Sequence, residues 1–120
     1  MRQVTLILED EQPMSWNKIY AGLHWSERKE EAARVHLAVR AALDPDLPIF
    51  DKPVAITVTA YFKNKRFQLD ASNIPAKIYE DGLIGWLIDD DSPQYVQSVT
   101  TVSLIDQNNP RVLIEIKEIL

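Results

Sequence analysis

The stretch from Val54 to Phe62 alternates cleanly between apolar residues and their neighbours. Its apolar positions are Val54, Ile56, Val58, Ala60 and Phe62. A period of two places all of them on one face of an extended chain, which predicts a strand with one buried face. Val4, Leu6 and Leu8 repeat the pattern near the start. Two more strands are predicted from about Tyr95 to Leu104 and from Val112 to Ile119, joined by residues 106–110 as a hairpin loop.

Two segments have helical rather than alternating patterns. From Ser26 to about Leu43 the apolar residues form one stripe, and Ser26 is the expected N-cap. In this first helix Glu30 and Arg34 stand one turn apart and are expected to pair. A second helix is predicted to begin near Ser72 or Asn73, with Pro75 in its first turn and Gly85 at its end.

The element order is β-α-β-α-β-β. This order predicts an α/β (α+β) fold, a small mixed sheet with two helices packed on it. The 120 residues suit a single domain spanning 1–120, and a hydrophobic fraction of 46% can fill its core. The chain has no cysteine and no apolar run of membrane-spanning length, and its first residues lack a signal peptide's apolar stretch. We therefore expect a cytoplasmic protein that does not enter a membrane.

The formal net charge of −5 argues mildly against a protein that coats a phosphate backbone. A carboxylate-rich metal site would reconcile that charge with nucleic-acid binding. Such a site lowers the net charge of the chain, and the bound cation restores positive charge locally.

The segment from Lys63 to Tyr95 carries the residues best suited to chemistry. Asp70 immediately precedes the second predicted helix, Asn73 opens it, and Lys77 lies one turn further on the same face. Asp89, Asp90 and Asp91 follow in a loop after that helix. Mg²⁺ prefers carboxylate oxygens, and a nearby lysine can neutralise a scissile phosphate. If the loop folds back toward Asp70, these groups form a metal site for phosphodiester cleavage.

Ordinary structural roles are an open alternative for the same residues. Aspartates before helices are usually caps, and acidic loops that end in Ser-Pro are usually solvated turns. The aromatic residues before and at the start of the first helix also allow two interpretations. Trp16, Tyr20 and Trp25 either stack on an unpaired base or cover the core or a dimer interface.

These residues together resemble one family. Asp70-x-x-Asn73, Lys77, Asp81-Gly82-Leu83 and the run Leu87 to Val96, with Asp90-Asp91-Ser92 inside it, are similar to the motifs of the RusA-type crossover junction endodeoxyribonucleases. Ser15-Trp16-Asn17-Lys18, with His24-Trp25 and Arg28, also looks like phage and prophage members of that family. The resemblance extends from about Thr5 to Val102.

The resemblance implies a homodimer that binds branched DNA, in the form of four-way (Holliday) junctions, and nicks two strands symmetrically with Mg²⁺, for which Mn²⁺ can substitute. Carried over by position, Asp70, Lys77 and Asp91 are the catalytic residues. Asp70, Asp90 and Asp91 are the metal ligands, with Asp91 the better match of the adjacent pair. The implied DNA-binding residues are Lys63, Lys65, Arg66, Asn73 and Arg28.

One motif position departs from the family pattern. Ser72 stands where the family has its second aspartate; in a second alignment Asp70 takes that place and Gln68 the first. Asp89, Glu80 or Asp81 could replace the missing carboxylate, although Glu80 and Asp81 lie far along the helix. The departure leaves open a junction-binding or architectural DNA module that has lost cleavage. A third reading is an interaction domain unrelated to nucleic acid.

Overall fold

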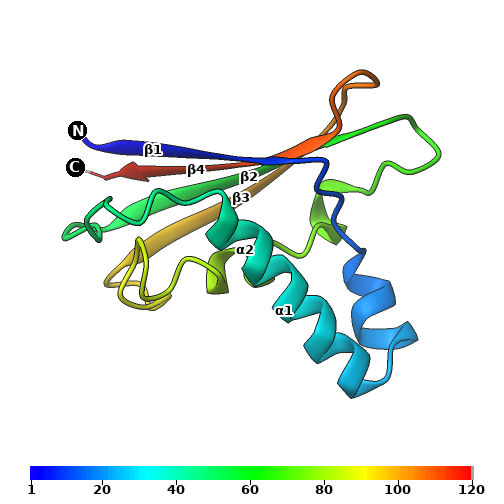
Figure 1. Cartoon of the computed structure of the whole chain (residues 1–120), viewed down its shortest axis with the longest axis horizontal. Coiled ribbons are helices and arrows are strands. Elements are labelled where there is room, and N and C mark those ends of the chain that lie inside the picture. Colours follow the sequence, from blue (N-terminus) through cyan, green and yellow to red (C-terminus); the bar gives the residue numbers. More distant parts are fainter. Residues whose placement is uncertain (120) are drawn as a thin grey trace.

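A four-stranded mixed sheet forms one layer of the computed structural model, which describes residues 1–119 (Figure 1). The strands are β1 (Gln3–Glu9), β2 (Val54–Phe62), β3 (Val96–Ile105) and β4 (Arg111–Glu118), in the spatial order β1-β4-β2-β3. β4 pairs antiparallel with both β1 and β2, whereas β3 pairs parallel with β2. The expected mixed sheet with helices packed on it is therefore confirmed.

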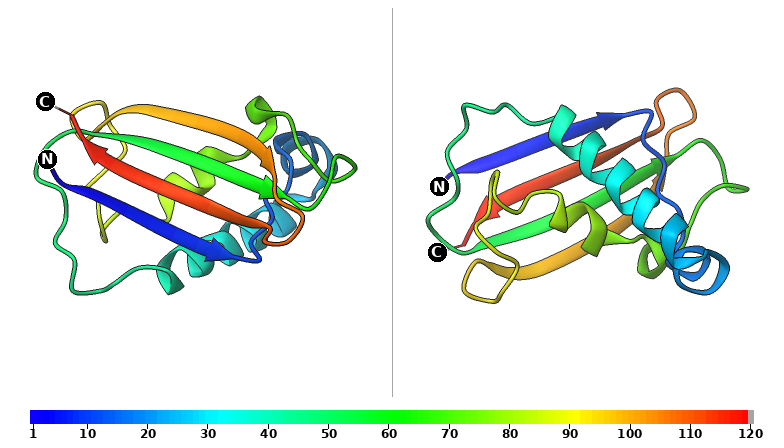
Figure 2. Two further views of the ribbon diagram at one scale, coloured as in Figure 1. Left: turned by 90° about the horizontal axis from the view of Figure 1, so that it is seen from above. Right: turned by 60° about the horizontal axis from the view of Figure 1, so that its bottom comes forward.

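Two α-helices, α1 (Trp25–Ala41) and α2 (Ala76–Asp81), lie on one face of this sheet. Figure 2 shows the bare face in its left view and the helix-covered face in its right view. The covered face buries apolar positions that the alternation predicted, among them Leu6, Ile56 and Val58, together with Ile114 of β4. The hydrophobic core therefore lies between the sheet and the helices.

The predicted hairpin between the last two strands is wrong. β3 and β4 are consecutive in the chain, but β2 lies between them in the sheet. Residues 106–110 therefore cross the end of β2, where the backbone N–H of Asp106 donates to the carbonyl of Phe62 over 2.9 Å. Pairing partners are non-local, so a loop with turn-forming residues does not by itself establish a hairpin.

The second predicted helix is divided into two parts. A 3₁₀ turn, η2 (Ala71–Asn73), comes first, and α2 starts only after Pro75. Ile74, which precedes the proline, is extended at φ −77° and ψ 126°, because a following proline disfavours the helical conformation. α2 ends at Gly82 rather than at Gly85, which lies beyond it in a turn with φ of 82°. A Cβ on Gly82 would stand 3.1 Å from that of Val39, so this glycine lets α1 and α2 approach closely.

The start of α1 also differs from the sequence prediction. His24, and not Ser26, is the N-cap: its Nδ1 accepts a hydrogen bond from the backbone N–H of Ser26 over 3.3 Å. A short π-helical turn, η1 (Lys18–Gly22), precedes it. Tyr20 and Trp25 are exposed, whereas Trp16 is half-buried against the core. Within residues 1–119, no helix is long and apolar enough to cross a membrane.

Candidate metal centre

Lys77, in the first turn of α2, lies among three carboxylates. Its Nζ is 2.8 Å from Oδ1 of Asp81 and 3.9 Å from Oε1 of Glu80, and it also contacts Oδ2 of Asp91. Glu80 and Asp81 come from the same helix, three and four residues after the lysine. Asp91 comes from the loop that follows. The acidic loop therefore folds back onto α2.

The carboxylates of Glu80, Asp81 and Asp91 form one group. Each offers an oxygen that lies within 4.8 Å of the other two. Three carboxylate oxygens from a helix and a loop are donors suited to a hard divalent cation such as Mg²⁺ or Mn²⁺. We name Glu80, Asp81, Asp91 and the lysine between them the Lys77 cluster. Its ligand chemistry is generic for such cations and does not select Mg²⁺.

The three acids occupy different electrostatic environments. Glu80 is 6% exposed, and burial raises the pKa of its carboxyl above the ordinary value. Asp91 is more accessible, and the hydrogen bond from Lys77 lowers the pKa of its carboxyl. Hydrogen bonds to Asp81 and then Asp91 raise the pKa of Lys77 in turn. The ammonium therefore partly neutralises a site that has an excess of negative charge.

Of the three predicted metal ligands, only Asp91 belongs to this cluster. Asp70 is exposed just before η2, makes no side-chain capping bond there, and lines a shallow depression of about 510 Å³ together with Lys65 and Ser103. Asp90 is exposed in the acidic loop. Glu80 and Asp81, which the sequence placed too far along the helix, instead lie with Asp91.

The spacing of the helix could have identified the two missing residues. Lys77, Glu80 and Asp81 stand at i, i+3 and i+4, which are the positions that meet on one side of a helix. The family motif pointed to Asp70, at the entrance of the helix. The prediction therefore centred the metal site there and not on the face that Lys77 shares with Glu80 and Asp81.

Asn73 holds a different part of the chain. Its Oδ1 accepts a hydrogen bond from the backbone N–H of Asn17 over 3.1 Å. This contact ties the segment before η1 to η2, fifty-six residues further along the chain. The Asn of the Asp70-x-x-Asn73 motif thus joins the two stretches on which the family resemblance depends.

The predicted DNA-binding cations lie in two places. Lys63, Lys65 and Arg66 are exposed in the loop after β2. Arg28 lies on α1 with its guanidinium 5.8 Å from the ring centre of Tyr20. The loop cations and Asp70 belong to one connection, residues 63–70, which leads directly into η2.

A second polar network lies between the N-terminal segment and the helices. Arg34 of α1 donates to both carboxylate oxygens of Glu11 over 2.8 and 2.9 Å, and to Glu31 over 2.6 Å. The hydroxyl of the buried Tyr79 donates to Glu11 over 2.7 Å. The expected partner Glu30 is therefore wrong: Glu31, three residues before Arg34, pairs with it. Because Tyr79 lies between Lys77 and Glu80 in α2, this network fixes the helix that carries the cluster.

The chain matches no protein-family model and no curated protein.

Proposed function

We propose that this domain is a RusA-like, divalent-metal-dependent endonuclease that acts on four-way DNA junctions. The observation that carries the proposal is the position of Asp91, which lies in the Lys77 cluster with Glu80 and Asp81. The motif order of Asp70, Asn73, Lys77 and the Asp90-Asp91 pair supports the assignment to this family. Because Ser72 replaces one aspartate of the family motif, the motif lacks one carboxylate. Glu80 and Asp81 of the Lys77 cluster supply carboxylates beside Asp91.

Each residue of the cluster has a defined part in the proposed reaction. Asp91 and Asp81 would hold a divalent cation, and Glu80 would offer a third carboxylate oxygen. A bound divalent ion would supply an activated water and stabilise charge on the phosphate. Lys77 would neutralise the phosphate as a point charge. The exposed loop cations Lys63, Lys65 and Arg66 would hold flanking phosphates.

A homodimer fits this proposal because a four-way junction offers two equivalent strands to nick. The bare face of the sheet is the surface through which two copies of the chain would pair. Ile7 and Leu104 on that face are 52% and 42% exposed. Tyr61, Val102 and Leu113 occupy neighbouring positions in the same strand register. Two copies packed through this face would cover these apolar side chains and carry two sites about a twofold axis.

The decisive experiment is cleavage of an end-labelled four-way junction by the purified protein with Mg²⁺ or Mn²⁺. We expect paired nicks that Asp91→Asn reduces by more than about 100-fold, since even residues that only support a metal ligand change activity by 10- to 100-fold. Asp106→Asn is the matched control. It also breaks an ion pair, the 2.8 Å contact between Asp106 and Arg111, but lies outside the cluster.

The same assay distinguishes the nuclease from the alternative that Ser72 favours, a DNA-binding module that has lost cleavage. A junction that is retarded in a gel but not nicked with either metal would identify a binding module without cleavage. Nicking that Asp91→Asn and Asp106→Asn reduce equally would remove the cluster from the mechanism. A protein that neither retards nor nicks the junction would refute both versions of the proposal.

A further inference from the structure

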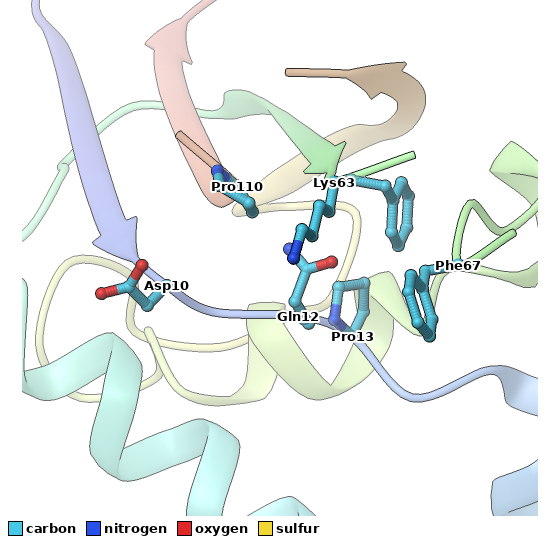
Figure 3. A pocket seen from close by; sticks show the side chains of 7 residues that line it. Asp10, Gln12, Pro13, Lys63, Phe67 and Pro110 are labelled. Atoms are coloured by element: carbon cyan, nitrogen blue, oxygen red, sulfur yellow. The ribbon is translucent and has the colours of Figure 1, made fainter. Parts of the chain in front are cut away.

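Next to the loop that leads to Asp70, a cavity of about 490 Å³ opens where β1 and β2 end (Figure 3). Its apolar walls are Pro13, Phe62 and Phe67, and its polar groups are Asp10, Gln12 and Lys63. We call it the Phe67 cavity. Its volume falls in the range of sites that enclose small organic ligands. It lies apart from the Lys77 cluster and shares no residue with it.

The aromatic wall of this cavity has an accessible face. Phe67 is 56% exposed although it stands beside the apolar surfaces of Pro13 and the buried Phe62. Figure 3 shows the Phe67 ring and Pro13 bordering the same space, with Lys63 reaching toward it from the end of β2. A flat ligand could therefore stack on Phe67 and be enclosed from the other side by proline.

The polar group at the base of the cavity has a fixed orientation. Nε2 of Gln12 donates to the backbone carbonyls of Glu11 and Tyr61, over 2.8 and 3.0 Å. These two acceptors determine which end of the amide is nitrogen, so Oε1 is an acceptor held in place. Within residues 1–119, no donor reaches that oxygen. A ligand with an N–H group in the plane of an aromatic ring would satisfy it.

The charges around the cavity complete the description of the ligand. Lys63 lines the cavity, and Lys65 and Arg66 follow it in the same exposed loop. The Arg66 guanidinium lies 5.7 Å from the centre of the Phe67 ring. Asp10, at the opposite edge, is a second acceptor. An aromatic ring with N–H donors that is attached to a phosphate backbone matches this arrangement of acceptors inside and cations outside.

We propose that the Phe67 cavity binds one unpaired nucleobase of a DNA strand, with the base stacked on Phe67, an N–H donated to Gln12 and the adjoining phosphate held by Lys63. This inference rests on the proposed function, because it takes the substrate to be DNA. It places an unstacked base on the connection that continues to Asp70, three residues beyond Phe67. Tyr20 and Trp25, the exposed aromatics that the sequence singled out, line no such cavity among those described.

The test is fluorescence of a short single-stranded oligodeoxythymidylate that carries one central 2-aminopurine, titrated with the 120-residue chain in EDTA. We expect quenching on binding, and affinity that falls about fivefold or more in Phe67→Ala, the range for loss of one base–aromatic stack. Gln12→Glu should lose affinity as well, because it removes the amide donors that fix the side chain and places a second negative charge beside Asp10. Trp86→Ala is the matched control, since Trp86 is another exposed aromatic, 43% accessible and paired with Arg40.

A second probe tests the cavity without any substitution. The same oligonucleotide with an abasic site in the central position and a fluorescent label at its end should bind the wild-type protein more weakly than the labelled parent. Equal affinity for the two probes, or loss of quenching in Trp25→Ala but not in Phe67→Ala, would overturn the proposal. Because both titrations exclude metal, they report on the cavity even where junction nicking fails. Conversely, junction nicking without base-dependent binding would refute base binding in the Phe67 cavity and leave the proposed nuclease function standing.

Discussion

Glu80 stands in an environment that is unfavourable to its own charge. Its carboxyl is buried, and its one cationic neighbour, Lys77, stands at 3.9 Å, beyond hydrogen-bonding distance. Burial raises the pKa of this carboxyl in the folded protein. A raised carboxyl pKa means that the folded state binds the proton more tightly than the unfolded state does. The contribution of Glu80 to stability is therefore most favourable at low pH and declines as the pH rises through the folded pKa.

We predict that Glu80→Gln raises the thermal stability of the protein at neutral pH while weakening its affinity for Mn²⁺. The amide retains the shape of the side chain and removes a desolvated charge, but it also removes an anionic ligand. Thermal unfolding between about pH 4 and 8 checks the first effect, with the difference between variant and wild type growing as pH rises. Glu115→Gln, on the bare face of the sheet, is the control. A variant less stable than wild type at neutral pH would contradict this account.

At the scale of elements, the ammonium group of Lys77 holds the acidic loop and α2 together. Lys77 bridges Asp81 of the helix and Asp91 of the loop. An ammonium and a divalent ion would draw on the same carboxylate oxygens. The side chain proposed to assist cleavage is thus also a competitor of the metal.

Replacing Lys77 with methionine should separate these two roles. We expect Lys77→Met to bind Mn²⁺ more tightly in the absence of DNA, by up to about 30-fold, since two exposed ion pairs each contribute at most about 1 kcal/mol. Junction nicking should fall in the same variant. Calorimetric titration with Mn²⁺ measures the affinity, and Lys52→Met serves as an exposed lysine outside the cluster. Weaker Mn²⁺ binding by Lys77→Met would show that the lysine organises the carboxylates instead of competing for them.

The sequence predicted those features of the elements that are local. Alternation identified the strands because a period of two depends only on neighbours. It could not show that β2 would separate β3 from β4, since pairing joins segments far apart. Asp91 was recognised through its motif, and the i, i+3, i+4 spacing places Glu80 and Asp81 on one side of the helix with Lys77. That Asp91 joins them depends on how the loop returns, which the sequence does not show. The ion pair of Glu11 with Arg34, 23 residues apart, had no local signal at all.

At the scale of the whole molecule, the two faces of the sheet differ in what covers them. The helices occupy one face, and the left view of Figure 2 shows the other face bare. Ile7 and Leu104, on that face, are exposed. If two copies pair through this face, as the proposed function requires, sedimentation equilibrium should give a dimer. The double variant Ile7→Glu, Leu104→Glu should then be a monomer, because like charges would be forced into the apolar interface.

Leu37 provides the matched control for this measurement. It is 68% exposed on α1, which covers the opposite face, so Leu37→Glu should leave the dimer intact. A wild-type protein that sediments as a monomer throughout, or a dimer that only Leu37→Glu dissociates, would exclude pairing through the sheet.

The strand order also determines what happens when the chain is shortened from its C-terminal end. β4 is the last strand in the sequence, but it lies between β1 and β2 and is the one strand that pairs with β1. Removing the residues after Pro110 would therefore take β4 out of the interior of the sheet and leave β1 without its neighbouring strand. A ribosome must release the residues of β4 before the fold can close, so nascent chains should remain sensitive to proteases until this strand has left the ribosome.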